Sequence, residues 1–90
     1  MDTVLITGTT SGIGKAFAEQ FAANGSNIIL VSRNEETLRQ KQESLQSRYH
    51  VQVAAIPCDL SEANAAYRIL ERLSQLDWPV DILVNNAGFN

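Results

Sequence analysis

Three glycines and four hydroxyl residues gather in the stretch LITGTTSGIGKAF, residues 5–17. Gly8, Gly12 and Gly14 stand between an apolar run and a segment with helical period. Backbone N–H groups at the start of a helix, together with the helix dipole, hold phosphate groups when no Cβ keeps the ligand away. We expect Gly8 to permit a tight turn, Gly12 a close ligand approach and Gly14 close packing of helix on strand. The chemistry predicted for this turn is the binding of a pyrophosphate.

Thr9, Thr10 and Ser11 place three hydroxyl groups between these glycines. Hydroxyl groups here can donate hydrogen bonds to phosphate or ribose, or can bond the loop to itself as turn residues do. The sequence leaves both roles open. Lys15, which follows the last glycine, is expected to point to solvent.

Four short runs rich in Val, Ile and Leu predict strands over residues 4–6, 27–31, 51–56 and 80–84. Most of these runs are apolar at consecutive positions rather than at alternate ones. That pattern is typical of parallel strands whose two sheet faces are both covered by helices.

Three segments with helical period lie between the predicted strands. The first has an apolar face and ends at Gly25, a residue suited to the left-handed stop of a helix. Its apolar face consists of Ile13, Phe17 and Phe21. The second is predicted to begin after Asn34 as N-cap and to bury Leu38 and Leu45.

The third helical segment has the strongest apolar stripe. Ser61 is its predicted N-cap, and Asp77-Trp78-Pro79 ends it. The stripe consists of Ala66, Ile69, Leu70, Leu73 and Leu76, and we expect Tyr67 to pack there as well.

The alternation of strands and helices predicts an α/β fold with a doubly wound parallel sheet, similar to the Rossmann fold, with about four strands and three helices. Ninety residues allow at most one domain. A flavodoxin-like strand order is the alternative that the sequence leaves open.

Composition excludes several classes of partner. The net charge is −3, and the seven basic residues are scattered, which argues against a nucleic acid or an acidic membrane surface. Cys58 and His50 are the one cysteine and the one histidine, so we expect no disulfide and no metal site. No apolar run approaches the roughly 20 residues that span a bilayer, and we expect a cytoplasmic protein.

Three motifs carry a resemblance to a known family. The residues TGTTSGIG at 7–14 resemble the T-G-x-x-x-G-I-G signature of the short-chain dehydrogenases/reductases. Asn85-Asn86-Ala87-Gly88 is similar to the N-N-A-G motif of that family, and Cys58-Asp59-Leu60 is similar to its D-[LV] pair. Each motif follows a different predicted strand, in the order of the family.

The resemblance implies a role for each of these residues. Asp59, next to Leu60, would meet the adenine ring, and Asn86 would bond across to the neighbouring strand. Ala87 and Gly88 would let the backbone lie against the adenosine ribose. The alternative for residues 85–88 is an ordinary turn.

The end of the second predicted strand indicates the cofactor. Enzymes selective for NAD place an Asp or Glu about 20 residues past the glycine turn, where it binds the ribose 2′-hydroxyl. Ser32 and Arg33 stand there instead. A guanidinium can pair with a 2′-phosphate through two parallel hydrogen bonds, and the serine adds a small donor. We therefore predict NADP rather than NAD; the alternative is a solvated surface arginine at the strand end, which could also pair with Glu36.

The catalytic groups that the resemblance implies are a serine and a Tyr-x-x-x-Lys, both beyond the fourth strand. Tyr49 and Tyr67 do not fit, because Val53 and Glu71 stand four residues after them. No catalytic residue is assigned, and we expect a truncated gene, an isolated segment or an ordered fragment.

The resemblance implies that residues 1–90 are the N-terminal part of a single dinucleotide-binding Rossmann domain. The expected function is the cofactor-binding half of an NADP(H)-dependent oxidoreductase that interconverts a carbonyl and an alcohol. We expect the 90 residues alone to be inactive and the full-length protein to be a homo-oligomer. The alternative is a non-catalytic nucleotide-binding or interaction module.

Overall fold

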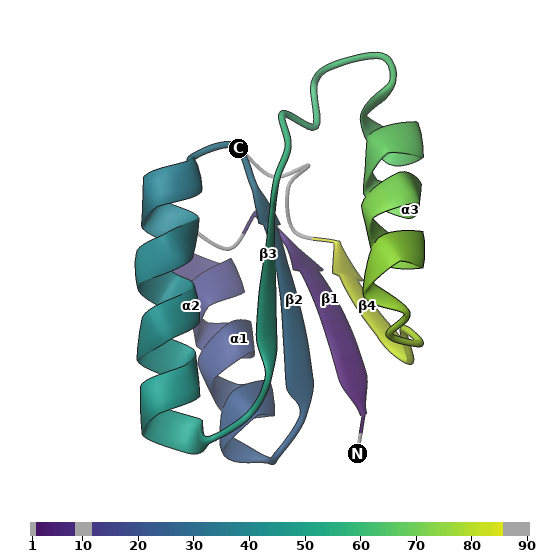
Figure 1. The fold of residues 1–90 in the computed structure, drawn as a ribbon. Coiled ribbons are helices and arrows are strands. Elements are labelled where there is room, and N and C mark those ends of the chain that lie inside the picture. Colours follow the sequence, from purple (N-terminus) through teal and green to yellow (C-terminus); the bar gives the residue numbers. More distant parts are fainter. Residues whose placement is uncertain (1, 9–11, 86–90) are drawn as a thin grey trace.

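The computed structural model describes residues 2–8 and 12–85, and Figure 1 shows their fold. Strands and helices alternate along the chain. They are β1 (Thr3–Thr7), α1 (Gly12–Ala23), β2 (Asn27–Ser32), α2 (Glu35–Tyr49), β3 (Val53–Pro57), α3 (Ala65–Leu76) and β4 (Ile82–Asn85). All four predicted strands form, although β3 and β4 begin two residues later than predicted, after Val51 and Val80.

The four strands form one parallel sheet in the order β3-β2-β1-β4. This arrangement confirms the predicted doubly wound fold. A flavodoxin-like sheet would place the third strand directly beside the first. Here β2 lies between β1 and β3, so the flavodoxin-like alternative is wrong.

Helices cover both faces of the sheet, with α1 and α2 on one face and α3 on the other (Figure 1). Neighbouring residues of a strand therefore enter two different cores. Val4 and Ile6 of β1 pack with α1 and α2 residues, whereas Leu5 packs in the second cluster together with Ala65 of α3. This double burial explains why the strands are apolar at consecutive positions.

The structure confirms the residues that were predicted to end α1 and to begin α2. Asn34 caps α2, since its Oδ1 accepts a hydrogen bond from the backbone N–H of Thr37 at 3.0 Å. Gly25 adopts a left-handed φ of 89° just after α1. Leu38 and Leu45 are buried, as predicted.

The face of α1 that meets the sheet differs from the prediction. Phe17 is 39% exposed and Phe21 is only partly buried, while Gly14, Ala18 and Ala22 are buried. The side chain of Ile13 lies outside the described part. Small residues every four positions let the helix backbone approach the strands, and the two aromatic rings stack at its flank with centroids 6.4 Å apart.

The start and the apolar stripe of α3 were also predicted wrongly in part. The helix begins at Ala65, with Asn64 as N-cap, because Ser61 is engaged in a turn with Asp59 instead. Ile69, Leu73 and Leu76 pack against the sheet as predicted. The stripe members Ala66 and Leu70 are exposed, and so is Tyr67. Ala66 and Leu70 line a cleft together with Leu5 of β1 and Leu83 of β4, so this part of the stripe is not closed against the sheet.

An apolar surface at β4 and α3 leads to a first prediction. Tyr67, Leu70 and Leu83 are 71%, 64% and 61% exposed, and β4 is an edge strand of this sheet. Exposed apolar edges pair with other chains. The 90-residue chain is therefore expected to elute in size-exclusion chromatography above its mass of 9.9 kDa. Leu70→Glu should shift it toward the monomer, while Gln40→Glu on α2 should not. Elution of the unaltered chain as a monomer at all concentrations would contradict this expectation.

No helix within residues 2–8 and 12–85 is long and apolar enough to cross a membrane.

Candidate functional site

A cleft of about 1250 Å³ runs from the carboxyl edge of the sheet along the face that α3 covers, where Leu5, Leu70 and Leu83 also line it. Every strand contributes the residues at its end. The lining residues from this edge include Thr7 and Gly8 of the first strand end, Ser32 and Arg33 of the second, Cys58, Asp59 and Leu60 of the third, and Asn85 of the fourth. The parallel sheet thus brings together candidate residues that are far apart in the sequence.

Gly8, which directly follows β1, has the conformation expected of a turn glycine. Gly8 has a φ of 71°, in the left-handed region where a side chain is strained. Its N–H donates to the carbonyl oxygen of Val31 at 2.9 Å, which fixes the turn against β2. Helix α1 begins at Gly12, two residues before the buried Gly14. Thr9, Thr10 and Ser11 lie outside the described residues.

The end of β2 presents one buried and one exposed polar residue. Ser32 is 8% exposed and lines the cleft, and Arg33 follows it with an exposed side chain. Among the described residues Arg33 forms no ion pair, so the alternative pairing with Glu36 does not occur. The guanidinium is therefore free to bind an anion at the cleft.

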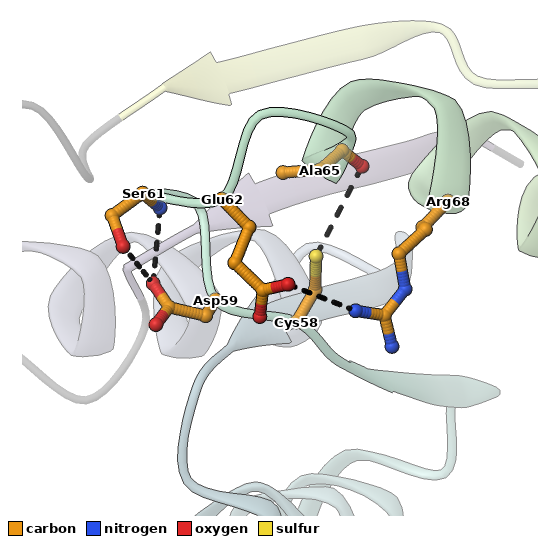
Figure 2. A network of polar contacts seen from close by, with 6 residues as sticks. All are labelled: Cys58, Asp59, Ser61, Glu62, Ala65 and Arg68. Carbon is orange, nitrogen blue, oxygen red and sulfur yellow. Dashed lines mark hydrogen bonds and ion pairs between the residues drawn. The ribbon is translucent and has the colours of Figure 1, made fainter.

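The end of β3 holds a carboxylate in a defined turn, shown in Figure 2. Asp59 Oδ1 accepts hydrogen bonds from the backbone N–H of Ser61 at 3.0 Å and from its hydroxyl at 2.7 Å. These bonds, the hydroxyl's first, lower the pKa of Asp59, and the nearby charge of Arg33 lowers it further. The pKa starts from an ordinary value near 3.8, so Asp59 is ionised at neutral pH.

Neighbouring residues shape the same loop (Figure 2). The thiol of Cys58 is buried, with its Sγ 3.9 Å from the carbonyl oxygen of Ala65. Glu62 and Arg68 form an exposed ion pair at 3.6 Å across the start of α3. Cys58 is thus part of the packing between β3 and α3, as expected for a structural cysteine.

The end of β4 is tied to β1 by a residue that sequence reasoning did not select. The hydroxyl of Thr7 donates to Asn85 Oδ1 at 3.1 Å, and the two residues are register partners in the parallel pair. The sequence signal for this bond was a hydroxyl residue at the end of one predicted strand and an amide residue at the end of another. Asn86, Ala87 and Gly88 lie outside the described residues.

The cleft therefore combines groups for two kinds of ligand chemistry. After β2 lies the cation of Arg33, which can pair with a phosphate. Near β3 lies an ionised carboxylate that accepts hydrogen bonds from an amino group. No group of three His, Cys, Asp or Glu in the described part of the chain could hold a metal ion.

Comparison with known proteins agrees with this geometry. A family profile described as short chain dehydrogenase matches residues 2–90. The chain belongs to the short-chain dehydrogenase family. Solved structures of short-chain dehydrogenases share the fold of this segment. L-sorbose reductase from Gluconobacter frateurii, solved with NADPH and L-sorbose, superposes with a TM-score of 0.89 at 35% identity, over 94% of this chain and 32% of that chain.

Two other relatives differ in what their names state. The human protein named inactive hydroxysteroid dehydrogenase-like protein 1 is 45% identical over 85 residues, which is 93% of this chain and 25% of that protein. A xylitol dehydrogenase solved with NAD⁺ bound has a TM-score of 0.82 at 26% identity, over 91% of this chain and 31% of that chain. This short-chain dehydrogenase segment thus spans about a quarter to a third of the length of these relatives.

Proposed function

We propose that residues 1–90 are the N-terminal part of a single dinucleotide-binding Rossmann domain, in an NADP(H)-dependent oxidoreductase that interconverts a carbonyl and an alcohol. One observation carries this proposal. The glycine turn of β1, the unpaired Arg33 after β2 and the ionised Asp59 after β3 line one cleft. A dinucleotide needs an anion site, a ribose site and a base site side by side, and the cleft offers residues for each.

The cofactor, when bound, supplies the hydride that is transferred to or from the substrate carbon. Within this chain, the turn from Gly8 to Gly14 and the start of α1 hold the pyrophosphate. Asp59 accepts a hydrogen bond from the adenine amino group, beside Leu60. Ala87 and Gly88 would let the backbone lie against the adenosine ribose, and Asn86 would bond across to the neighbouring strand.

The preference for NADP rests on the chemistry at the end of β2. The guanidinium of Arg33 has no ion-pair partner among the described residues, and Ser32 places a hydroxyl beside it. A 2′-phosphate carries close to two negative charges and three terminal oxygens, two of which can accept parallel hydrogen bonds from a guanidinium. The NADPH bound to L-sorbose reductase supports this preference, whereas the xylitol dehydrogenase with NAD⁺ shows that the fold also holds the other cofactor.

A non-catalytic role is the second candidate. The name of the human relative, which is 45% identical to this chain, says that it is inactive. Neither tyrosine of the 90 residues has a lysine four positions later, so these residues do not supply the proton donor that carbonyl reduction needs. A serine and a Tyr-x-x-x-Lys encoded after Asn90 would favour the enzyme over the non-catalytic module.

The proposed function is tested by following NADPH oxidation with a panel of ketones and aldehydes. A native-length protein is expected to oxidise NADPH with at least one of them, whereas the 90 residues alone should bind NADPH weakly and show no turnover. Turnover by residues 1–90 alone would place the proton donor within this chain and contradict the proposal. A native-length protein that binds NADPH but turns over no carbonyl would support the non-catalytic candidate instead.

A further inference from the structure

The loop after β3 fixes the carboxylate of Asp59 through a single neighbour. The backbone N–H and the hydroxyl of Ser61 both donate to Oδ1, at 3.0 Å and 2.7 Å (Figure 2). Two bonds to one oxygen restrict both the rotamer and the plane of the carboxylate, because the donors come from one residue in a fixed turn.

The second carboxylate oxygen remains available. No donor among the described residues contacts Asp59 Oδ2, and Asp59 lines the cleft. An ionised carboxylate has about four acceptor positions, of which Ser61 uses two on Oδ1. The turn thus leaves one oxygen of a preoriented carboxylate for a ligand.

Ser61 has no competing structural duty in the part of the chain that the structure describes. Helix α3 begins four residues later, with Asn64 as its N-cap. The loop also has backbone bonds of its own, from Glu62 N to Asp59 O at 3.1 Å and from Ala65 N to Glu62 O at 3.2 Å. Ser61 is exposed, so its hydroxyl can be removed without opening a cavity in the core.

We propose that Ser61 is a positioning residue for adenine recognition, which holds Asp59 so that its free oxygen accepts the hydrogen bond of the adenine amino group. This inference rests on the proposed function, in which Asp59 meets the adenine. A site built around such a bond favours adenine over an analogue that lacks the amino group, because the analogue leaves the carboxylate oxygen without its donor. The carboxylate positioned by Ser61 is thus a source of base selectivity.

The test compares the dissociation constants of NADP⁺ and its hypoxanthine analogue, in which a carbonyl oxygen replaces the amino group, on the native-length protein. The unaltered protein should prefer NADP⁺ by about tenfold or more, the range of a hydrogen bond to a charged group. Asp59→Ala should abolish the preference. Ser61→Ala keeps the backbone N–H bond and should reduce the preference by roughly threefold to tenfold, whereas Ser61→Thr keeps the hydroxyl and should restore it.

Ser74→Ala is the matched control, since Ser74 also donates its hydroxyl, to the carbonyl oxygen of Glu71 at 2.7 Å, but on α3 outside the cleft. It should leave the preference unchanged. A full preference in Ser61→Ala, with the preference lost in Asp59→Ala, would overturn the positioning role alone. A full preference in Asp59→Ala would instead contradict the adenine contact of the proposed function.

Discussion

A Gly14→Val variant is expected to lose detectable binding of NADPH. Gly14 is buried in the first turn of α1, in line with Ala18 and Ala22, each of which is 1% exposed. Valine adds three carbon atoms where the helix packs against the strands, and overpacking of this kind typically costs about 1–3 kcal/mol. The start of α1 would move away from the turn that we propose for the pyrophosphate. Gly12→Val should have the same effect by blocking the close approach of the ligand.

Isothermal titration with NADPH measures this loss, with circular dichroism as a check on the fold. Gly25→Ala is the matched control, because Gly25 lies outside the cleft and a Cβ there would meet no atom within 4 Å. Its φ of 89° makes the substitution strained, so some stability should be lost while binding remains. Unchanged affinity in a folded Gly14→Val protein would refute the role of this turn.

Arg33→Asp is expected to lower the affinity for NADPH ten- to a hundredfold relative to the affinity for NADH. The substitution removes charge-assisted hydrogen bonds, worth about 1.5–3 kcal/mol for a charged group, and adds a carboxylate that repels a 2′-phosphate. Asp at this position could also accept hydrogen bonds from the ribose 2′-hydroxyl of NADH. The ratio of the two dissociation constants is the quantity to measure.

Arg72→Asp changes the charge by the same amount on α3, at a position that does not line the cleft. The ratio for this control should equal that of the unaltered protein. An unchanged ratio in Arg33→Asp would mean that Arg33 is a solvated surface residue and that the choice of cofactor is made elsewhere.

Periodicity and turn chemistry predicted most of the fold. Gly25 follows the end of α1 and Asn34 caps the start of α2. Both roles depend on near neighbours and therefore follow from local sequence. The strand order does not, because which strand lies beside β1 depends on crossovers between distant residues. The sequence therefore left the flavodoxin-like order open until β2 was seen between β1 and β3.

The errors in the helices have a common cause. Apolar residues at helical spacing show which residues share a face, but the distance to the sheet decides which face is buried. In α1 close packing selects Ala18 and Ala22 over Phe17. In α3 part of the stripe lines the cleft instead of closing against the sheet, which leaves Leu70 exposed.

The sequence predicted that Arg33 and Asp59 lie at the candidate site, but it did not predict the contact of Ser61 with Asp59. Arg33 and Asp59 line the cleft, as their places after β2 and β3 suggested. Ser61 was predicted to be a helix cap. A serine before a helical segment can either cap the helix or form a turn, and the sequence does not distinguish the two roles. The cross-strand bond was assigned to Asn86, which lies outside the described residues, and the bond that the structure does describe joins Asn85 to Thr7.

The proposal that the cleft at the carboxyl edge of the sheet is a dinucleotide site is tested most directly by ¹⁵N–¹H NMR. Titration of the ¹⁵N-labelled protein with NADP⁺ should shift the backbone amide signals of Gly8, Arg33 and Asp59, which come from the ends of three different strands. The signals of Glu43 and Arg48, on α2 and away from the cleft, should stay in place. Shifts confined to residues outside the cleft, or no shifts at millimolar NADP⁺, would contradict the proposed site.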